Sequence, residues 1–149
     1  MIYAQERKVV DVLMPTAMVS NATTTASIDT LGFDYLQLIW HLATATSTAG
    51  IAVECKVVES DDLTTYTAIV PFTGGTATST SVGFVIPNAH ATIDQQFVMN
   101  MDLRGRKRYL KCSISPHTNQ INYIVGVLDR AKVMPDTIAE ANVALMVNG

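Results

Sequence analysis

The sequence predicts an all-β protein, a sandwich or barrel of about eight strands. Two observations support this fold class. Short runs rich in Val, Ile, Tyr and Phe alternate between apolar and other residues with a period of two, which is typical of half-buried strands. Clusters of Thr, Ser and Gly separate these runs at short intervals, as turns separate the strands of a sandwich. The main clusters cover 20–27, 44–50, 61–65 and 73–81.

Five segments carry the strand pattern clearly and three carry it more weakly. In the first clear segment Leu36, Leu38, Trp40 and Leu42 share one face. In the last clear segment Gly126 predicts a bulge, because glycine inside a strand often marks one. The clear segments are Tyr35–Leu42, Ile51–Glu59, Gln95–Asp102, Tyr109–Ser115 and Gln120–Leu128, and the weaker ones are Lys8–Leu13, Tyr66–Val70 and Gly83–Ile86.

The length of 149 residues predicts a single domain. We expect an N-terminal arm over residues 1–12, the sandwich over 13–130, and a C-terminal arm or short helix over 131–149. The helix is suggested by helical spacing in Thr137–Val147, with Asp136 as its N-cap.

The composition is poor in charge, at 15% against the roughly 25% of ordinary soluble domains. Thr, Ser and Ala take the place of charged residues, and such a surface is suited to being covered by other protein. High hydrophobicity excludes disorder, and a net charge of -3 argues against a dedicated nucleic-acid binder. We expect no signal peptide, no membrane span and no disulfide framework, and therefore free thiols in a reducing cytoplasm.

The sequence shows no arrangement of residues that predicts catalysis. His41, His90 and His117 lack any metal-ligand spacing, and Cys55 and Cys112 fall on apolar strand faces, where buried structural thiols are expected. The acidic cluster 59–62 is compatible with a turn or with a Ca²⁺ site, and the turn is favoured because EF-hand spacing is missing. We therefore expect no enzyme activity, no cofactor and no metal.

The strongest charge feature gathers five of the ten basic residues into eight positions. Three interpretations remain open. The segment is a solvated hairpin turn with Gly105 at its bend, a contact patch that binds an acidic surface through arginine–carboxylate pairs, or a nucleic-acid site. The five basic residues are Arg104, Arg106, Lys107, Arg108 and Lys111.

Three motifs in order give the chain a family resemblance. They are Ile28-Asp-Thr-Leu-Gly-Phe-Asp-Tyr35, Glu59-Ser-Asp-Asp62 and Asp102-Leu-Arg-Gly-Arg-Lys-Arg-Tyr-Leu110. Over about residues 28–128 the chain resembles the jelly-roll cement, or decoration, proteins of tailed-phage heads. The motif residues are Asp29, Gly32, Asp34, Tyr35, Asp61, Asp62, Gly105 and Tyr109.

The resemblance implies a jelly-roll-like antiparallel β-sandwich with a passive, structural function. Such a protein binds the outer surface of the capsid after synthesis in the host cytoplasm. Its partners are the major capsid protein and further copies of itself, as a dimer or trimer, with no nucleic acid and no membrane. In that setting Arg106 or Arg108 pairs with a carboxylate such as Asp29, Asp34 or Asp102 and is structural. The alternatives are another virion component, such as a head-completion or tail protein, and a carbohydrate-binding β-sandwich.

Overall fold

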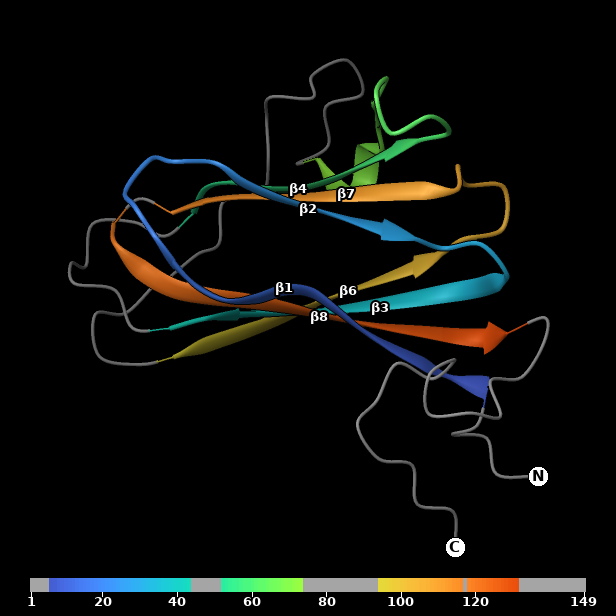
Figure 1. Cartoon of the computed structure of the whole chain (residues 1–149), viewed down its shortest axis with the longest axis horizontal. Coiled ribbons are helices and arrows are strands. Elements are labelled where there is room, and N and C mark those ends of the chain that lie inside the picture. Colours follow the sequence, from blue (N-terminus) through green and yellow to red (C-terminus); the bar gives the residue numbers. More distant parts are fainter. Residues whose placement is uncertain (1–5, 44–51, 74–93, 117, 132–149) are drawn as a thin grey trace, which may run out of the picture.

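The computed structural model describes residues 6–43, 52–73, 94–116 and 118–131, and these residues form an all-β structure (Figure 1). The predicted fold class is confirmed. The described strands are β1 (Lys8–Met18), β2 (Thr24–Asp29), β3 (Phe33–Leu42), β4 (Ala52–Ser60), β5 (Thr67–Ala68), β6 (Gln95–Asp102), β7 (Tyr109–Pro116) and β8 (Gln120–Ala131), with a short 3₁₀ helix η2 (Val70–Phe72) after β5.

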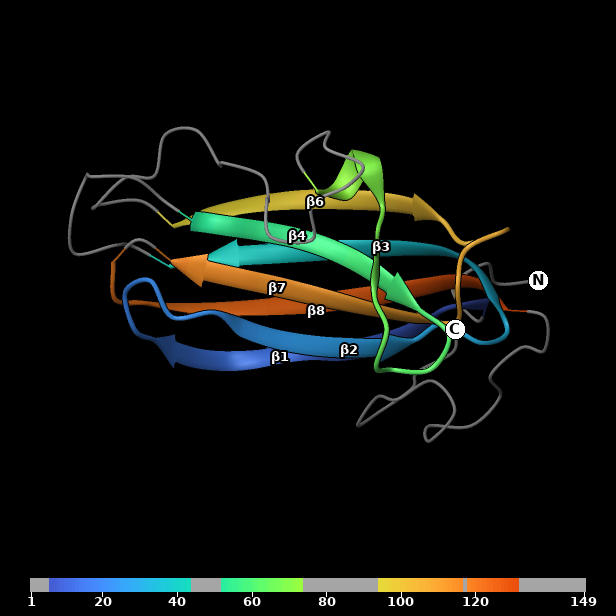
Figure 2. The same ribbon diagram turned by 90° about the horizontal axis from the view of Figure 1, so that it is seen from above.

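The strands form two antiparallel four-stranded sheets that face each other. Sheet A has the order β1-β8-β3-β6, and sheet B has the order β2-β7-β4-β5. Consecutive strands alternate between the sheets, except that β4 and β5 pair within sheet B. This strand order is that of a jelly roll, the double-sheet form built from two Greek keys. Figures 1 and 2 show the two layers from the side and from above.

The core lies between the sheets and consists of the inward residues of both. Leu36, Leu38, Trp40 and Leu42 of β3 are all buried, as the alternation in the sequence predicts. Trp40 is fully buried and stacks on Phe97 of the neighbouring β6, with ring centroids 5.3 Å apart. Burying each large apolar side chain contributes about 1.5–3 kcal/mol to folding, so this face of β3 anchors the sandwich.

Two segments differ from their predicted structure at the N-terminal side. Thr24–Asp29 is a strand, although its Ser and Thr content predicts a loop, because Ala26 and Ile28 pack on the core while Thr25 and Ser27 face outward. The strand β1 begins at Lys8, so residues 8–12 belong to sheet A and are not part of an arm. The weak strand prediction for this segment is confirmed.

Gly126 does not form the predicted bulge. Its strand β8 pairs with β3 in regular register, and the irregularities lie in β1, between Asp11 and Leu13 and between Leu13 and Thr16. Gly126 instead lies where side chains of β1 and β3 come close to the backbone of β8. A Cβ atom there would lie 3.1 Å from Cγ2 of Val12 and 3.4 Å from Cδ1 of Leu36.

The remaining predictions concern the ends and the middle of the chain. The segment predicted as a strand over Tyr66–Val70 is reduced to Thr67–Ala68, because the chain turns into η2, which begins at Val70 and has Pro71 as its second residue. The predicted strand Gly83–Ile86, the predicted helix Thr137–Val147 and residues 1–5 lie outside the described residues. In the described part of the chain, no helix has the length and apolar character needed to cross a bilayer.

Candidate functional site

The three motif segments meet at one end of the sandwich. They form the β2–β3 loop (residues 30–32), the β4–β5 loop (61–66) and the β6–β7 loop (103–108), which lie together at the right-hand end of Figure 1. We call these three loops and the strand ends beside them the motif end. The jelly-roll order brings them together because β2, β4 and β6 all run toward this end.

The β6–β7 loop is not the predicted hairpin turn. Its first strand, β6, pairs with β3 in sheet A, and its second strand, β7, pairs with β2 and β4 in sheet B. The basic loop therefore bridges the two sheets across the open end of the core. Leu103 is buried there, and its backbone N–H donates to the carbonyl of Asp34 at 2.8 Å.

Arg108 forms a bidentate ion pair with Asp29. Nε of Arg108 donates to Oδ1 of Asp29 at 3.0 Å, and Nη2 donates to Oδ2 at 2.7 Å. The guanidinium also lies 4.8 Å from the ring centroid of Tyr109. The hydrogen bond from Arg108 lowers the pKa of Asp29 below its usual value. Paired forks of this kind fix orientation as well as charge, so Arg108 ties β2 to the start of β7.

Thr30 strengthens the same connection from the backbone side. Its Oγ1 donates to the carbonyl of Arg108 at 2.7 Å, and its backbone N–H donates to that carbonyl at 3.0 Å. The next turn depends on Asp29, whose Oδ1 accepts the N–H of Leu31 at 3.0 Å, and on Gly32, whose φ is +90°. The Asp-Thr-x-Gly motif is thus a tight turn clamped to the basic loop.

Arg104 is held by the residue two positions before it. Its Nη2 donates to Oδ2 of Asp102 at 2.7 Å and its Nε donates to Oδ1 at 3.0 Å. The contact with Arg104 lowers the pKa of Asp102 to about 2. The Arg104 guanidinium lies 5.2 Å from the ring centroid of Tyr35, and that of Arg130 lies 5.3 Å from it.

Arg106 and Lys107 are paired more loosely, with residues of the acidic cluster. Nη1 of Arg106 lies 3.8 Å from Oε1 of Glu59, and Nζ of Lys107 lies 3.8 Å from Oδ2 of Asp61. The backbone N–H of Lys107 donates to Oε2 of Glu59 at 3.3 Å. Gly105 lets the chain turn before these residues with a φ of +80°.

The acidic cluster forms the predicted turn. Oδ1 of Asp62 accepts the backbone N–H groups of Thr65 at 2.7 Å and of Thr64 at 2.9 Å, and it accepts the hydroxyl of Ser60 at 2.8 Å. These hydrogen bonds, led by the one from Thr65, hold the pKa of Asp62 well below its usual range. The residues that the structure describes contain no group of three metal-binding side chains.

Lys111 lies apart from the other four basic residues. It is on β7 in sheet B, and its Nζ lies 3.5 Å from the ring centroid of Tyr66. The five cations therefore do not form one positive patch. Four face carboxylates at the motif end and the fifth sits on an aromatic ring. The family resemblance implied an arginine–carboxylate pair at the motif end. The sequence did not indicate the contact of Thr30 with Arg108 or that of Tyr66 with Lys111, because these partners come from distant parts of the chain.

The other candidates for chemistry have structural partners in the fold. The His41 and Tyr123 rings stack with centroids 4.4 Å apart, and Nε2 of His41 lies 3.9 Å from Oδ2 of Asp94. Cys55 and Cys112 are buried free thiols, and burial raises the pKa of Cys112 to about 12. A thiol of this kind stays protonated and is a poor nucleophile at neutral pH. His90 and His117 lie outside the described residues.

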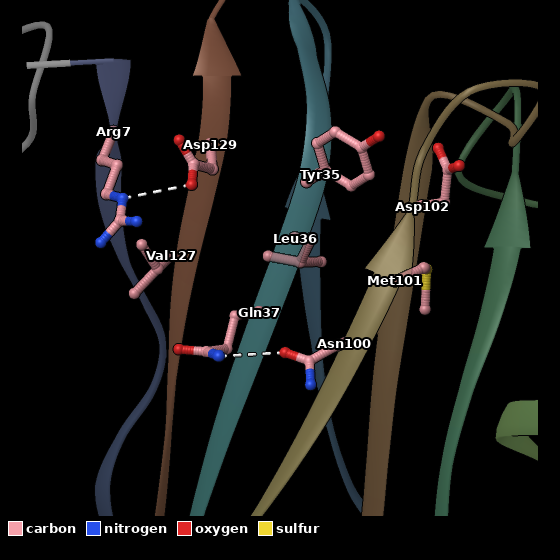
Figure 3. Close-up of a pocket in the computed structure, with 9 residues that line it drawn as sticks. All are labelled: Arg7, Tyr35, Leu36, Gln37, Asn100, Met101, Asp102, Val127 and Asp129. Carbon is pink, nitrogen blue, oxygen red and sulfur yellow. Dashed lines mark hydrogen bonds and ion pairs between the residues drawn. The ribbon is translucent and has the colours of Figure 1, made fainter. Parts of the chain in front are cut away.

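A shallow hollow of about 350 Å³ lies on the outward face of sheet A, beside the motif end (Figure 3). Its floor crosses β8, β3 and β6. Two polar links run across it, from Arg7 to Asp129 at 3.1 Å and from Gln37 Nε2 to Asn100 Oδ1 at 3.0 Å. These four side chains already hydrogen-bond to one another, and the hollow is open to solvent.

The comparisons with known proteins reach the level of the fold. No family model and no curated protein matches the chain. Among solved structures, the SPBc2 prophage-derived protein YomS is similar at 12% identity and a TM-score of 0.47, over 82% of this chain and 93% of YomS.

Two further solved structures show how widely this likeness extends. A chain of infectious bursal disease virus, Gx strain, is 13% identical with a TM-score of 0.46, over 83% of this chain and 32% of that one. BuGH86wt, solved in complex with neoagarooctaose, is 8% identical with a TM-score of 0.42, over 81% and 18%. Likeness at this level carries no argument about function, which has to come from the chain's own residues.

Proposed function

We propose that this protein is a non-enzymatic structural component of a virion, a capsid decoration protein of a phage head. It binds the outer capsid surface and clamps neighbouring major capsid subunits. One observation carries the proposal. The three motifs on which the family resemblance rests meet at one end of a jelly roll. The first and the last of them are joined by the ion pair of Asp29 and Arg108, which are 79 residues apart in the sequence. The motifs therefore meet in one built structure, which supports the resemblance.

The chemistry of the motif end suits a passive clamp. Each of the four basic residues of the β6–β7 loop faces a carboxylate, and a pre-ordered surface loses little conformational entropy when it binds. Many weak contacts repeated around a shell add up through multivalency. The low charge content of the chain, 15%, fits a surface that other protein subunits cover.

The pairing geometry sorts the basic residues into two roles. Arg104 and Arg108 make short bidentate pairs and support the loops. Lys107 lies 3.8 Å from Asp61, whose side chain is 70% exposed, so little is lost when Lys107 turns toward an acidic capsid surface. Exposed pairs of this kind are worth at most about 1 kcal/mol. Arg106 lies at the same distance from Glu59, but the Glu59 side chain is only 14% exposed, so Arg106 also neutralises a largely buried carboxylate. We assign the capsid contact to Lys107, with Arg106 beside it.

The test is to add the purified protein to phage heads that lack it and to image them by electron microscopy. We expect new density on the outer surface, bridging capsid subunits, and particles that withstand higher temperature. The variant Lys107→Ala should fold normally and weaken head binding, whereas Arg108→Ala should lose stability in the free protein. Absence from the head, or density confined to the tail, would refute the proposal and favour another virion component.

The carbohydrate-binding alternative can be separated by a second measurement. Trp40 is fully buried, so it cannot serve as a platform for a sugar ring. The aromatic side chain beside the surface hollow is Tyr35 (Figure 3). A glycan-array signal that Tyr35→Ala abolishes would support the alternative, while no signal from the wild type argues against it.

A further inference from the structure

We propose that the core of the sandwich holds an ordered water molecule that bridges Asn122 and Trp40. This inference goes beyond the proposed function and does not depend on it. It starts from buried side-chain nitrogen and oxygen atoms that lack a hydrogen-bond partner. Among the described residues, such atoms occur at the end of the sandwich opposite the motif end, on the left of Figure 1, and none of them lies at the motif end.

Asn122 is a polar residue inside the core. It is an inward residue of β8, none of its surface is exposed, and it lies opposite Leu42 of β3. Its Nδ2 donates to Sδ of Met18 at 3.2 Å, although sulfur is a weak acceptor. Its Oδ1 accepts no hydrogen bond from the part of the chain that the structure describes. Because an amide oxygen has two lone pairs, Asn122 presents an unused acceptor to the core.

Trp40 supplies the matching donor. It is fully buried on the inward face of β3, opposite Ile124 of β8, so it stands diagonally across from Asn122. Diagonal neighbours on one face of a sheet have Cβ atoms roughly 7–8 Å apart, which is within reach of aromatic and long side chains. A buried tryptophan N–H usually finds a hydrogen-bond partner, yet Nε1 of Trp40 finds none among the described residues. The donor and the acceptor are thus placed for one bridging molecule.

The polar character continues one row further along the same face. Gln120 is the next inward residue of β8 and lies opposite Met18 of β1. Its Nε2 is a second buried donor without a partner in the described segments. The inward face of β8 therefore changes along its length, from apolar Ile124 and Leu128 to two amides at its beginning. Buried polar groups that lack protein partners are where proteins hold internal water.

Water is the molecule that these groups select. They are neutral, and they offer two donors and one acceptor, so they fit a small neutral partner that both accepts and donates. Leaving them unpaired would cost a large part of the small net stability of a domain. A water molecule accepts the N–H of Trp40, donates to Oδ1 of Asn122 and has a second lone pair for Nε2 of Gln120. Buried waters typically make about three hydrogen bonds, and proteins contain about one for every 27 residues.

The test is NMR spectroscopy of the full chain labelled with ¹⁵N. Trp40 is the only tryptophan, so its indole N–H gives a single resonance. We expect cross-peaks between this proton and water whose NOE and ROE have opposite signs, as a long-lived bound water produces, whereas proton exchange gives equal signs. A high-resolution crystal structure should show the water within about 3.2 Å of both Nε1 of Trp40 and Oδ1 of Asn122.

The variant Asn122→Leu removes the acceptor and fills the space of the water. We expect the water cross-peak of Trp40 to disappear and its emission to move to shorter wavelength, because the indole loses a polar partner. Asn122→Ser keeps an acceptor and leaves more room, so its cross-peak should remain. Gln37→Leu, a matched change at an exposed position on the outward face of β3, should behave like the wild type. Unchanged resonances at the motif end check the fold of each variant.

A wild-type indole without a bound-water cross-peak overturns the inference, and this result does not depend on whether Asn122→Leu folds. A cross-peak that persists in folded Asn122→Leu, or that is lost equally in Gln37→Leu, overturns the assignment to Asn122. A crystal structure in which protein groups occupy the hydrogen bonds of both atoms overturns it as well. The proposed function is tested by head binding and is unaffected by any of these results.

Discussion

Replacing Gly126 by alanine tests how closely β1 and β8 are packed. The added Cβ would lie 3.1 Å from Cγ2 of Val12, 3.4 Å from Cδ1 of Leu36 and 3.7 Å from Cδ2 of Leu38. Overpacking a core costs about 1–3 kcal/mol. Removing a glycine from a strand returns about 0.5–1 kcal/mol through the unfolded chain. The net expectation is a loss of about 1 kcal/mol, within a range of about 0–2.5 kcal/mol, in the free energy of unfolding.

Urea unfolding followed by the emission of Trp40 measures this loss. The midpoint should fall without a change in slope, because the surface exposed on unfolding is almost the same. In thermal unfolding a loss of about 1 kcal/mol corresponds to a Tm lower by about 2–4 °C for a chain of this length. The variant Val12→Ala removes the nearest methyl groups. In Gly126→Ala/Val12→Ala the two changes should therefore cost at least about 0.5 kcal/mol less than the sum of the single losses.

Gly105→Ala is the matched control for this cycle. No atom lies within 4 Å of the position of its Cβ, and its φ is +80°. Its cost of about 1–2 kcal/mol comes from the left-handed backbone, so it should add to that of Val12→Ala without coupling. A Gly126→Ala protein more stable than the wild type, or strict additivity with Val12→Ala, would refute the packing argument.

Three further predictions concern single residues. Arg108 lowers the pKa of Asp29, so the ionised Asp29 stabilises the fold fully above its unfolded pKa near 3.8, and this stabilisation is lost as the pH falls through the lower pKa of the folded state. The variant Asp29→Asn should therefore flatten the dependence of the urea midpoint on pH between about 2 and 5. Cys112, with a pKa of about 12, should not react with a thiol reagent at pH 8 until the protein unfolds, and rapid labelling of the native protein would contradict its burial. Thr30→Val should cost about 1 kcal/mol, because it removes the hydroxyl hydrogen bond to the carbonyl of Arg108, and an unchanged urea midpoint would show that this bond adds nothing.

The candidate site could be predicted in part. The family resemblance implied that Arg106 or Arg108 pairs with a carboxylate such as Asp29, Asp34 or Asp102, and the structure pairs Arg108 with Asp29, 79 positions away. No local pattern distinguishes Asp29 from Asp34 or Asp102, because all three flank strands. The choice depends on β2 and β7 being neighbours, which brings Asp29 opposite Tyr109 in the ladder.

The sequence by itself determined most of the strands, with β2 the clear exception, and which side chains of those strands face the core. In β3 the period-two alternation predicted the buried face correctly, because the direction of a side chain in a strand is a local property of the backbone. In β7 it predicted the core residues Leu110, Cys112 and Ile114, but the outward Ser113 and Ser115 are buried as well. The turn at Asp62 was also predictable, since its hydrogen bonds reach only two or three residues along the chain.

Only the tertiary structure decided which strand pairs with which. A hairpin of β6 and β7 was one interpretation of the sequence, and the fold places these strands in different sheets, with the basic loop between them closing the end of the core. It also showed that β2 is a strand, that Gly126 is a contact point, and that β8 presents apolar residues on both faces. Pairing is a competition among distant segments for the burial of a shared core. Its outcome is settled by the summed packing of both sheets and leaves little trace in any one segment.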